Sequence, residues 1–110
     1  MKNTVRFYFD YISPFAYLAY VRLQTLQTQL DLNIEYQPIL FAGLLNHWGH
    51  KGPAEIPPKR EFIFKECLRF AARHDIPFNG VPFHPFVPLN ALRVTLPEIC
   101  GLENQATMQV

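Results

Sequence analysis

The sequence predicts an α/β fold in which a β-α-β unit is followed by helices. In residues 4–10 apolar and polar side chains alternate, which is the period of a β-strand. Residues 14–30 instead place apolar side chains every three or four positions, which is typical of an amphipathic helix. The alternation returns in residues 33–38. A strand, a helix and a second strand in this order predict parallel pairing with a right-handed crossover.

The first helix is expected to begin at Ser13-Pro14. Serine is a favoured N-cap residue, and proline at the first helical position lacks an N–H that would have no partner within the helix. A helix start offers free backbone N–H groups and the positive end of the helix dipole, and both favour an anion. Two interpretations of Ser13 follow. It only caps the helix, or its hydroxyl also points at a bound anion or thiolate.

Prolines, glycines and one aspartate bound the other elements. Asp31 ends the first helical pattern, and Pro38, which has no N–H for a ladder, closes the second strand. A short apolar helix is expected over residues 41–48, up to Gly49, and a long helix over residues 58–74 after the loop 50–57. Three prolines favour an extended connector over residues 81–88. A helix over residues 89–96 then ends at Pro97, and the tail 98–110 is compatible with helix except at Gly101.

Both long helices carry a predicted apolar face. In the first helix this face comprises Phe15, Leu18, Ala19, Leu23, Leu26 and Leu30. In the second it comprises Ile63, Phe64, Cys67, Leu68 and Ala71. Lys65, Arg69 and Arg73 recur every four residues on the second helix and indicate a solvated face rather than a binding patch. Glu61 and Lys65 form a favourably oriented i,i+4 pair on it.

Composition indicates one globular domain and excludes several classes of function. The chain has 110 residues, 49% of them hydrophobic, which suffices for a core. A net charge of +1 is too balanced for a nucleic-acid binder with a basic face. No apolar run approaches the length that spans a bilayer, and no apolar segment follows Lys2 and Arg6, so a cytoplasmic location is expected. Cys67 and Cys100 are isolated and are expected to be reduced, small buried side chains.

The segment FYFDYISPFAYLA, residues 7–19, resembles the N-terminus of the kappa-class glutathione transferases and the 2-hydroxychromene-2-carboxylate isomerases. These enzymes belong to the thioredoxin-fold superfamily, which also contains DsbA. Redox members open this helix with Cys-x-x-Cys, whereas the corresponding residues here are Ser13-Pro14-Phe15-Ala16. Because both sulfurs are missing, dithiol–disulfide exchange at this position is excluded.

The resemblance continues in order through residues 49–60 (GHKGPAEIPPKR), 76–78 (IPF), 83–86 (FHPF) and 91–93 (ALR). It implies that residues 1–40 are the β-α-β portion of a thioredoxin-like fold and that residues 41–110 are the family's helical insertion. The family's thioredoxin domain has a second half, with two more strands and the cis-proline loop, which we expect to be missing from this chain. Because two strands alone make a marginal sheet with open edges, we expect a fragment, a truncated gene product, or a homodimer or domain-swapped assembly.

The resemblance also implies a glutathione site. Ser13 would hydrogen-bond the glutathione sulfur and favour its thiolate, with Pro14 and Phe15 beside it, and Lys59 would be a cationic contact. His50 falls where many members have Asn in a Gly-Asn-x-Pro-Pro pattern, so it could replace that Asn only as a different donor. The implied function is a glutathione-dependent isomerase or transferase in which the bound thiolate attacks an electrophilic, aromatic-type substrate. An isomerase would then eliminate the thiol after bond rotation.

Other functions remain open on the sequence. The chain is alternatively a catalytically inactive or partner-dependent thioredoxin-like module. As a DsbA-like oxidoreductase it would need Cys67 or Cys100 to be reactive. His47 and His50 lack a third ligand for a metal, and a Ser13-His84-Asp10 triad lacks the glycines of a nucleophile elbow. Four aromatic residues, Tyr8, Tyr11, Phe15 and Tyr17, either line a pocket for an aromatic ligand or belong to the core.

Overall fold

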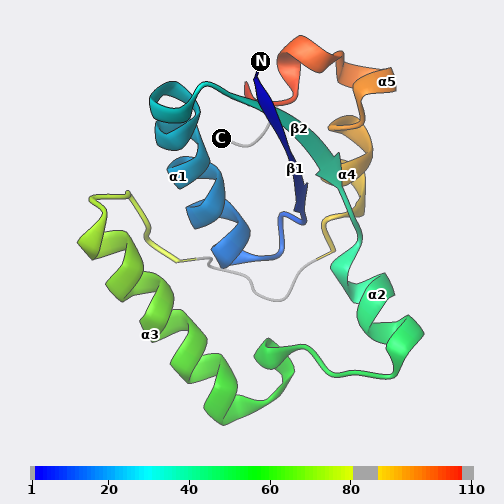
Figure 1. Cartoon of the computed structure of the whole chain (residues 1–110). Coiled ribbons are helices and arrows are strands. Elements are labelled where there is room, and N and C mark those ends of the chain that lie inside the picture. Colours follow the sequence, from blue (N-terminus) through cyan, green and yellow to red (C-terminus); the bar gives the residue numbers. More distant parts are fainter. Residues whose placement is uncertain (1, 81–86, 108–110) are drawn as a thin grey trace.

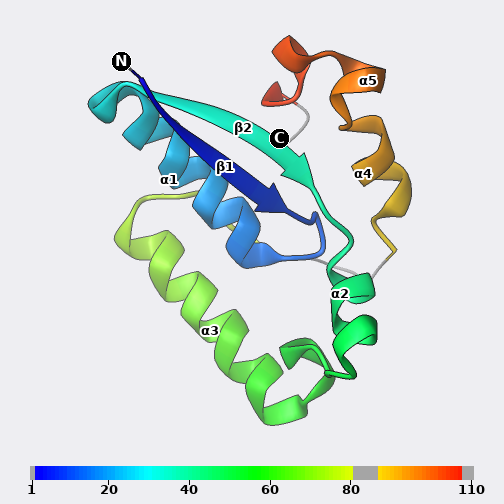
Figure 2. The same ribbon diagram turned by 45° about the vertical axis from the view of Figure 1, so that its right-hand side comes forward.

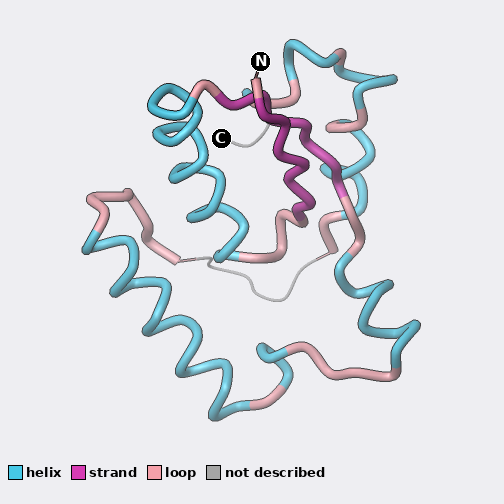
Figure 3. The backbone as a smooth tube through the Cα atoms, in the orientation of Figure 1, coloured by secondary structure: helices cyan, strands magenta, loops and turns pink. Residues whose placement is uncertain are grey.

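The computed structural model describes residues 2–80 and 87–107, in which a β-α-β unit leads into a series of helices (Figure 1). The unit consists of β1 (Asn3–Phe9), α1 (Pro14–Leu30) and β2 (Leu32–Pro38). The other elements are α2 (Phe41–Trp48), the 3-10 helix η1 (Pro53–Glu55), α3 (Pro57–Arg73), α4 (Leu89–Val94), α5 (Pro97–Cys100) and the 3-10 helix η2 (Leu102–Asn104). Within the described residues, β1 and β2 are the only strands (Figure 3). The α/β class is confirmed.

The two strands pair in parallel, from Asn3 opposite Leu32 to Phe9 opposite Pro38. Parallel pairing requires the crossover that α1 provides, because the end of β1 lies far from the start of β2. Asp31 ends α1 in a left-handed conformation, with φ of 50°, and β2 begins at the next residue. The predicted β-α-β unit is therefore confirmed, with strand bounds within a residue of those expected.

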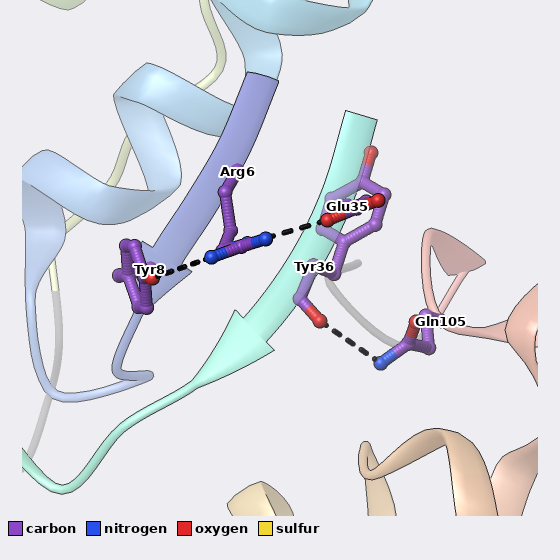
Figure 4. Close-up of polar contacts among 5 residues, drawn as sticks. All are labelled: Arg6, Tyr8, Glu35, Tyr36 and Gln105. Atoms are coloured by element: carbon purple, nitrogen blue, oxygen red, sulfur yellow. Dashed lines mark hydrogen bonds and ion pairs between the residues drawn. The ribbon is translucent and has the colours of Figure 1, made fainter. Parts of the chain in front are cut away.

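One face of the sheet packs against α1, and the other, called here the open face, is exposed in the described part of the chain. Phe9 is 2% exposed, and the rings of Tyr20 on α1 and Tyr36 on β2 meet edge to face at 6.3 Å. On the open face the Arg6 side chain donates to Glu35 at 3.3 Å and to the Tyr8 hydroxyl at 3.4 Å (Figure 4). Alternate residues of β1 therefore have different surroundings, as a half-buried strand requires.

The second long helix, α3, packs against α1 on the side away from the sheet (Figure 2). A buried cluster joins the two helices and consists of Leu18, Cys67, Ala71 and Ile76. The predicted ridge of Lys65, Arg69 and Arg73 is exposed, and Lys65 pairs with Glu61 at 2.7 Å. The predicted apolar face of α3 is correct for Cys67 and Ala71 but wrong for Leu68, which is exposed.

The predicted apolar face of α1 needs a larger correction. Leu18 is buried, but Phe15, Ala19 and Leu30 are exposed. The physical reason is that α1 lies between two partners, the sheet and α3. Its contacts are therefore spread around the helix and include aromatic residues such as Tyr17 and Tyr20.

The segment that begins with α4 and continues to Gln105 contacts the outer edge of β2 at Tyr36. The Gln105 side chain is 2% exposed and donates to the carbonyl of Tyr36, at 3.2 Å, and to that of Thr95, at 2.9 Å. It thus occupies a hydrogen-bonding position that a further strand would take (Figure 4). The helix expected over residues 89–96 ends earlier, at Val94, and Gly101, with φ of 85°, separates α5 from η2 in the tail. Of the predicted connector over residues 81–88, residues 81–86 lie outside the described part of the chain.

No helix among the described residues combines the length and the apolar character that crossing a membrane requires.

Candidate functional site

Ser13 caps α1 and keeps a hydroxyl proton available. Its backbone is extended, with φ of −91° and ψ of 114°, and its Oγ accepts a hydrogen bond from the Ala16 N–H at 3.2 Å. A serine hydroxyl that accepts one bond can still donate its proton. Pro14 has no N–H, and no acceptor among the described residues takes the Phe15 N–H. The start of α1 therefore presents two donors, one from the Ser13 side chain and one from the Phe15 backbone.

Ser13 borders a mostly apolar cavity of about 520 Å³, called here the first cavity. The start of α1, helix α2, the loop after α2 and α3 all contribute to its walls. Its lining consists of Ile12, Ser13, Pro14, Phe15, Phe41, Ala42, Leu45, Asn46, His50, Gly52, Pro53, Ala54, Glu55 and Ile63. The predicted site residues Ser13, Pro14, Phe15 and His50 thus come together around one cavity.

A glycine turn places His50 at the first cavity. Gly49 ends α2 in a left-handed conformation, with φ of 66°, which residues with a side chain rarely adopt. The chain then doubles back, and the His50 N–H donates to the Leu45 carbonyl at 2.9 Å. Gly52 is closely packed, since a Cβ there would lie 3.1 Å from a methyl group of Leu45, which would have to shift slightly. The local sequence therefore fixes how this loop faces the cavity.

Lys59 lies apart from the other predicted residues. It is the third residue of α3, is exposed, and belongs to the lining of neither cavity described here. It stands one helical turn before Ile63, which does line the first cavity. Residues four apart share a helix face, so Lys59 lies on the face of α3 that leads to the cavity.

Two polar lining residues, Asn46 and Glu55, were missed by the sequence analysis. Asn46 lies four residues after Ala42 on α2, and this spacing places both on one helix face. The Glu55 carboxylate accepts a hydrogen bond from the Gly52 N–H at 2.6 Å. An acidic residue three positions after a loop glycine is the spacing of a helix-start capping contact, and this signal was available in the sequence.

A smaller second cavity, of about 290 Å³, also borders Ser13 and Pro14. Tyr11, Tyr17 and Phe78 provide its aromatic walls, and the Tyr17 hydroxyl donates to the Pro77 carbonyl at 2.7 Å. The four aromatic residues expected at one pocket are therefore divided. Phe15 lines the first cavity, Tyr11 and Tyr17 line the second, and Tyr8 lies on the open face of the sheet.

The alternative chemistries find little support in the described residues. Both carboxylate oxygens of Asp10 accept backbone N–H groups, and His84, the third member of the triad considered, lies outside the described residues. No three metal-ligating side chains gather in residues 2–80 and 87–107. Burial raises the pKa of the Cys67 thiol to about 11, which disfavours the reactive thiolate, and Cys100 is only partly buried, contrary to expectation.

Comparison with known protein families gives one domain match that covers most of the chain. The model of the DSBA-like thioredoxin domain matches residues 4–95. This range contains β1 except its first residue, α1 and β2. It also contains all residues that line the two cavities and the predicted contacts Ser13, His50 and Lys59.

Similar curated proteins fall into two groups of enzymes. A 2-hydroxychromene-2-carboxylate isomerase of Sphingobium xenophagum is 39% identical over 81 residues, which cover 72% of this chain and 42% of that protein. Glutathione S-transferase kappa 1 of Caenorhabditis elegans is 33% identical over 79 residues, covering 71% of this chain and 35% of the transferase. The human glutathione S-transferase kappa 1 is 29% identical over 79 residues, with coverage of 72% and 35%. The matched region thus spans less than half the length of these relatives.

Proposed function

The chain belongs to the DSBA-like thioredoxin domain family, and from this premise we propose that it is a glutathione-dependent isomerase or transferase. The observation that carries the proposal is the placement of the Ser13 hydroxyl, at the start of a helix and at the edge of the first cavity. Relatives named as isomerases and as glutathione transferases support an enzyme of one of these two types.

The first cavity suits glutathione in size and in chemistry. Its volume of about 520 Å³ falls within the range of small-molecule sites, which is roughly 300–1,000 Å³. Glutathione carries two carboxylates and a peptide backbone, which need donors, and Asn46 and His50 offer donors on the cavity wall. Lys59 would attract one carboxylate from the adjoining face of α3. The apolar walls, with Phe15 and Phe41, suit the aromatic ring of a second substrate.

In this proposal Ser13 controls the charge on sulfur. Bound glutathione would supply a thiolate that adds to an electrophilic carbon of the substrate. The Ser13 hydroxyl would donate a hydrogen bond to that sulfur, and the Phe15 N–H would lie at the positive end of the α1 dipole. Both effects stabilise the anion and therefore lower the pKa of the thiol, by hydrogen bonding and dipole rather than by desolvation.

Titration calorimetry with glutathione tests the proposal. We expect saturable binding to the wild-type chain, weaker binding to Ser13→Ala, and binding close to wild type for Ser13→Thr, which keeps both the hydroxyl and the cap. Thr28→Ala is the matched control, because the exposed Thr28 hydroxyl only donates to the Thr25 carbonyl. Equal affinity in Ser13→Ala and in the wild type would contradict the role of Ser13, and absence of binding to the wild type would contradict the glutathione site.

The second candidate is a module that acts only after assembly, and the edge of β1 favours it. The Phe9 carbonyl accepts from the Ile39 N–H at 2.9 Å, so Phe9, Phe7 and Val5 direct their backbone groups toward β2. Thr4, Arg6 and Tyr8 direct theirs to the opposite edge, where no described strand pairs. We propose that a second copy covers this edge in a homodimer or swapped assembly, because an isolated two-stranded sheet is marginal.

A further inference from the structure

Asp10 joins two walls of the first cavity. Its side chain is buried, with 3% exposed. One carboxylate oxygen accepts a hydrogen bond from the Ile12 N–H at 3.1 Å, and the other accepts one from the Phe41 N–H at 2.8 Å. The Asp10 carbonyl also accepts from the Ser13 N–H at 3.1 Å. Because Ile12 and Phe41 both line the first cavity, a single side chain connects the Ser13 turn to the start of α2.

The bond to Phe41 caps α2 from a distant part of the chain. Leu40, the N-cap residue of α2, offers no side-chain acceptor, so the first N–H of the helix depends on Asp10. A carboxylate is suited to this position because the start of a helix favours negative charge. Asp10 takes part in none of the ion pairs among the described residues. The two N–H donors, from Ile12 and Phe41, are therefore what compensates the burial of its carboxylate.

We propose that Asp10 is a positioning residue, which sets the separation between Ser13 and the α2 wall and so determines how tightly the first cavity binds its ligand. The choice of glutathione as the ligand rests on the proposed function. The hydrogen bonds of Asp10 do not depend on it. Both carboxylate oxygens are needed, since both partners are donors. An asparagine would offer one oxygen, and its amide group would face the second N–H, so one of the two walls would be released.

The test compares Asp10→Asn with Gln105→Ala. Gln105 is equally buried and donates to two backbone carbonyls, but it lines neither cavity. Both variants are expected to be less stable than the wild type. Only Asp10→Asn is expected to speed amide hydrogen exchange at Ile12 or Phe41 beyond the global change, and to weaken glutathione binding by about tenfold or more, as expected for a lost bond to a charged group.

If Asp10→Asn does not fold, the variant Asp10→Glu still tests the positioning role. Asp10→Glu retains the charge and both oxygens but adds a methylene group, so it should fold while exchange at Phe41 rises and affinity falls. Wild-type exchange and affinity in this variant, or the same losses in Gln105→Ala, would overturn the positioning role. If the wild type does not bind glutathione, the proposed function fails, and the exchange rates of Ile12 and Phe41 alone decide the inference.

Discussion

Tyr11 donates a hydrogen bond to the hydroxyl of Thr95, 84 positions later in the chain. The direction of this bond follows from the next one, because the Thr95 hydroxyl uses its own proton on the Ala91 carbonyl, at 2.8 Å. Thr95 is fully buried, and its carbonyl also receives the Gln105 side chain. The turn that carries Ser13 is therefore anchored to the segment from α4 to η2.

Removing the hydroxyl groups of Tyr11 and Thr95 one at a time should separate the energetic contributions of the two hydrogen bonds. Tyr11→Phe deletes only the outer bond and is expected to lower the free energy of unfolding by about 1 kcal/mol. Thr95→Val deletes the acceptor for Tyr11 and the donor to Ala91 while keeping the shape, so a loss of about 2 kcal/mol is expected. Urea unfolding measures both. Equal stability of Thr95→Val and Tyr11→Phe would show that the bond to Ala91 contributes little.

The β-α-β unit could be predicted because its signals are local. Alternation in β1 and β2, the Ser13-Pro14 start and the Asp31 end each depend on neighbouring residues only. The buried face of α1 could not be predicted this way, since it depends on α3 and the sheet packing on different sides of the helix. The bond between Tyr11 and Thr95 has no local signal at all. The division of the chain at residue 40 stays a prediction.

Stability should fall at alkaline pH because of partly buried phenol groups. Burial is the main cause that raises the pKa of Tyr11, Tyr20 and Tyr36, whose ordinary value is about 10. Above that pH the unfolded chain loses phenol protons that the folded chain still holds. The contribution of these phenol groups to the free energy of unfolding is therefore complete below pH about 10. It is lost as the pH rises through their pKa values in the folded chain.

The variant Tyr20→Phe tests this sign. It lacks the bond from the Tyr20 hydroxyl to the Ala106 carbonyl, so it should be less stable than the wild type at pH 8. The difference should shrink between pH 9 and pH 11, since the variant has one phenol fewer to lose. In Thr28→Ala, where nothing that titrates is removed, the difference should stay constant. A constant difference for Tyr20→Phe as well would contradict the effect of burial.

Lys59 should contribute a modest charge effect to glutathione binding. An exposed charge near the ligand is worth up to about 1 kcal/mol, so Lys59→Gln should raise the dissociation constant by about fivefold or less. The effect should diminish at high salt, because screening weakens exposed charges. Lys65→Gln is the control on the same helix, where Lys65 lies on the exposed ridge and pairs with Glu61. Identical glutathione dissociation constants for both variants, measured by calorimetry, would show that Lys59 does not contact the ligand.

The residues of the candidate site that lie within a local sequence motif could be predicted. Those that the fold brings in from distant segments could not. Ser13 and His50 could be proposed because their segments resemble a family pattern, although His50 itself departs from it, and both line the first cavity. Phe41 and Asn46 carry no such signal, since an apolar helix and a single amide occur in many contexts. The role of Asp10 also depends on the path of the chain, because its partner Phe41 follows a complete crossover and second strand.

If a second copy pairs with the unpaired edge of β1, a proline on that edge should prevent the dimer from forming. Tyr8→Pro removes a backbone N–H that points away from β2, so the pairing of β1 with β2 should survive while pairing with a second copy is lost. The Tyr8 side chain is 53% exposed, so its removal should cost little stability. Tyr8→Thr, which keeps the N–H, is the control. We expect sedimentation to show a dimer for the wild type and Tyr8→Thr and a folded monomer for Tyr8→Pro. A monomeric wild type that still binds glutathione would instead mean that the edge needs no partner for the site to form.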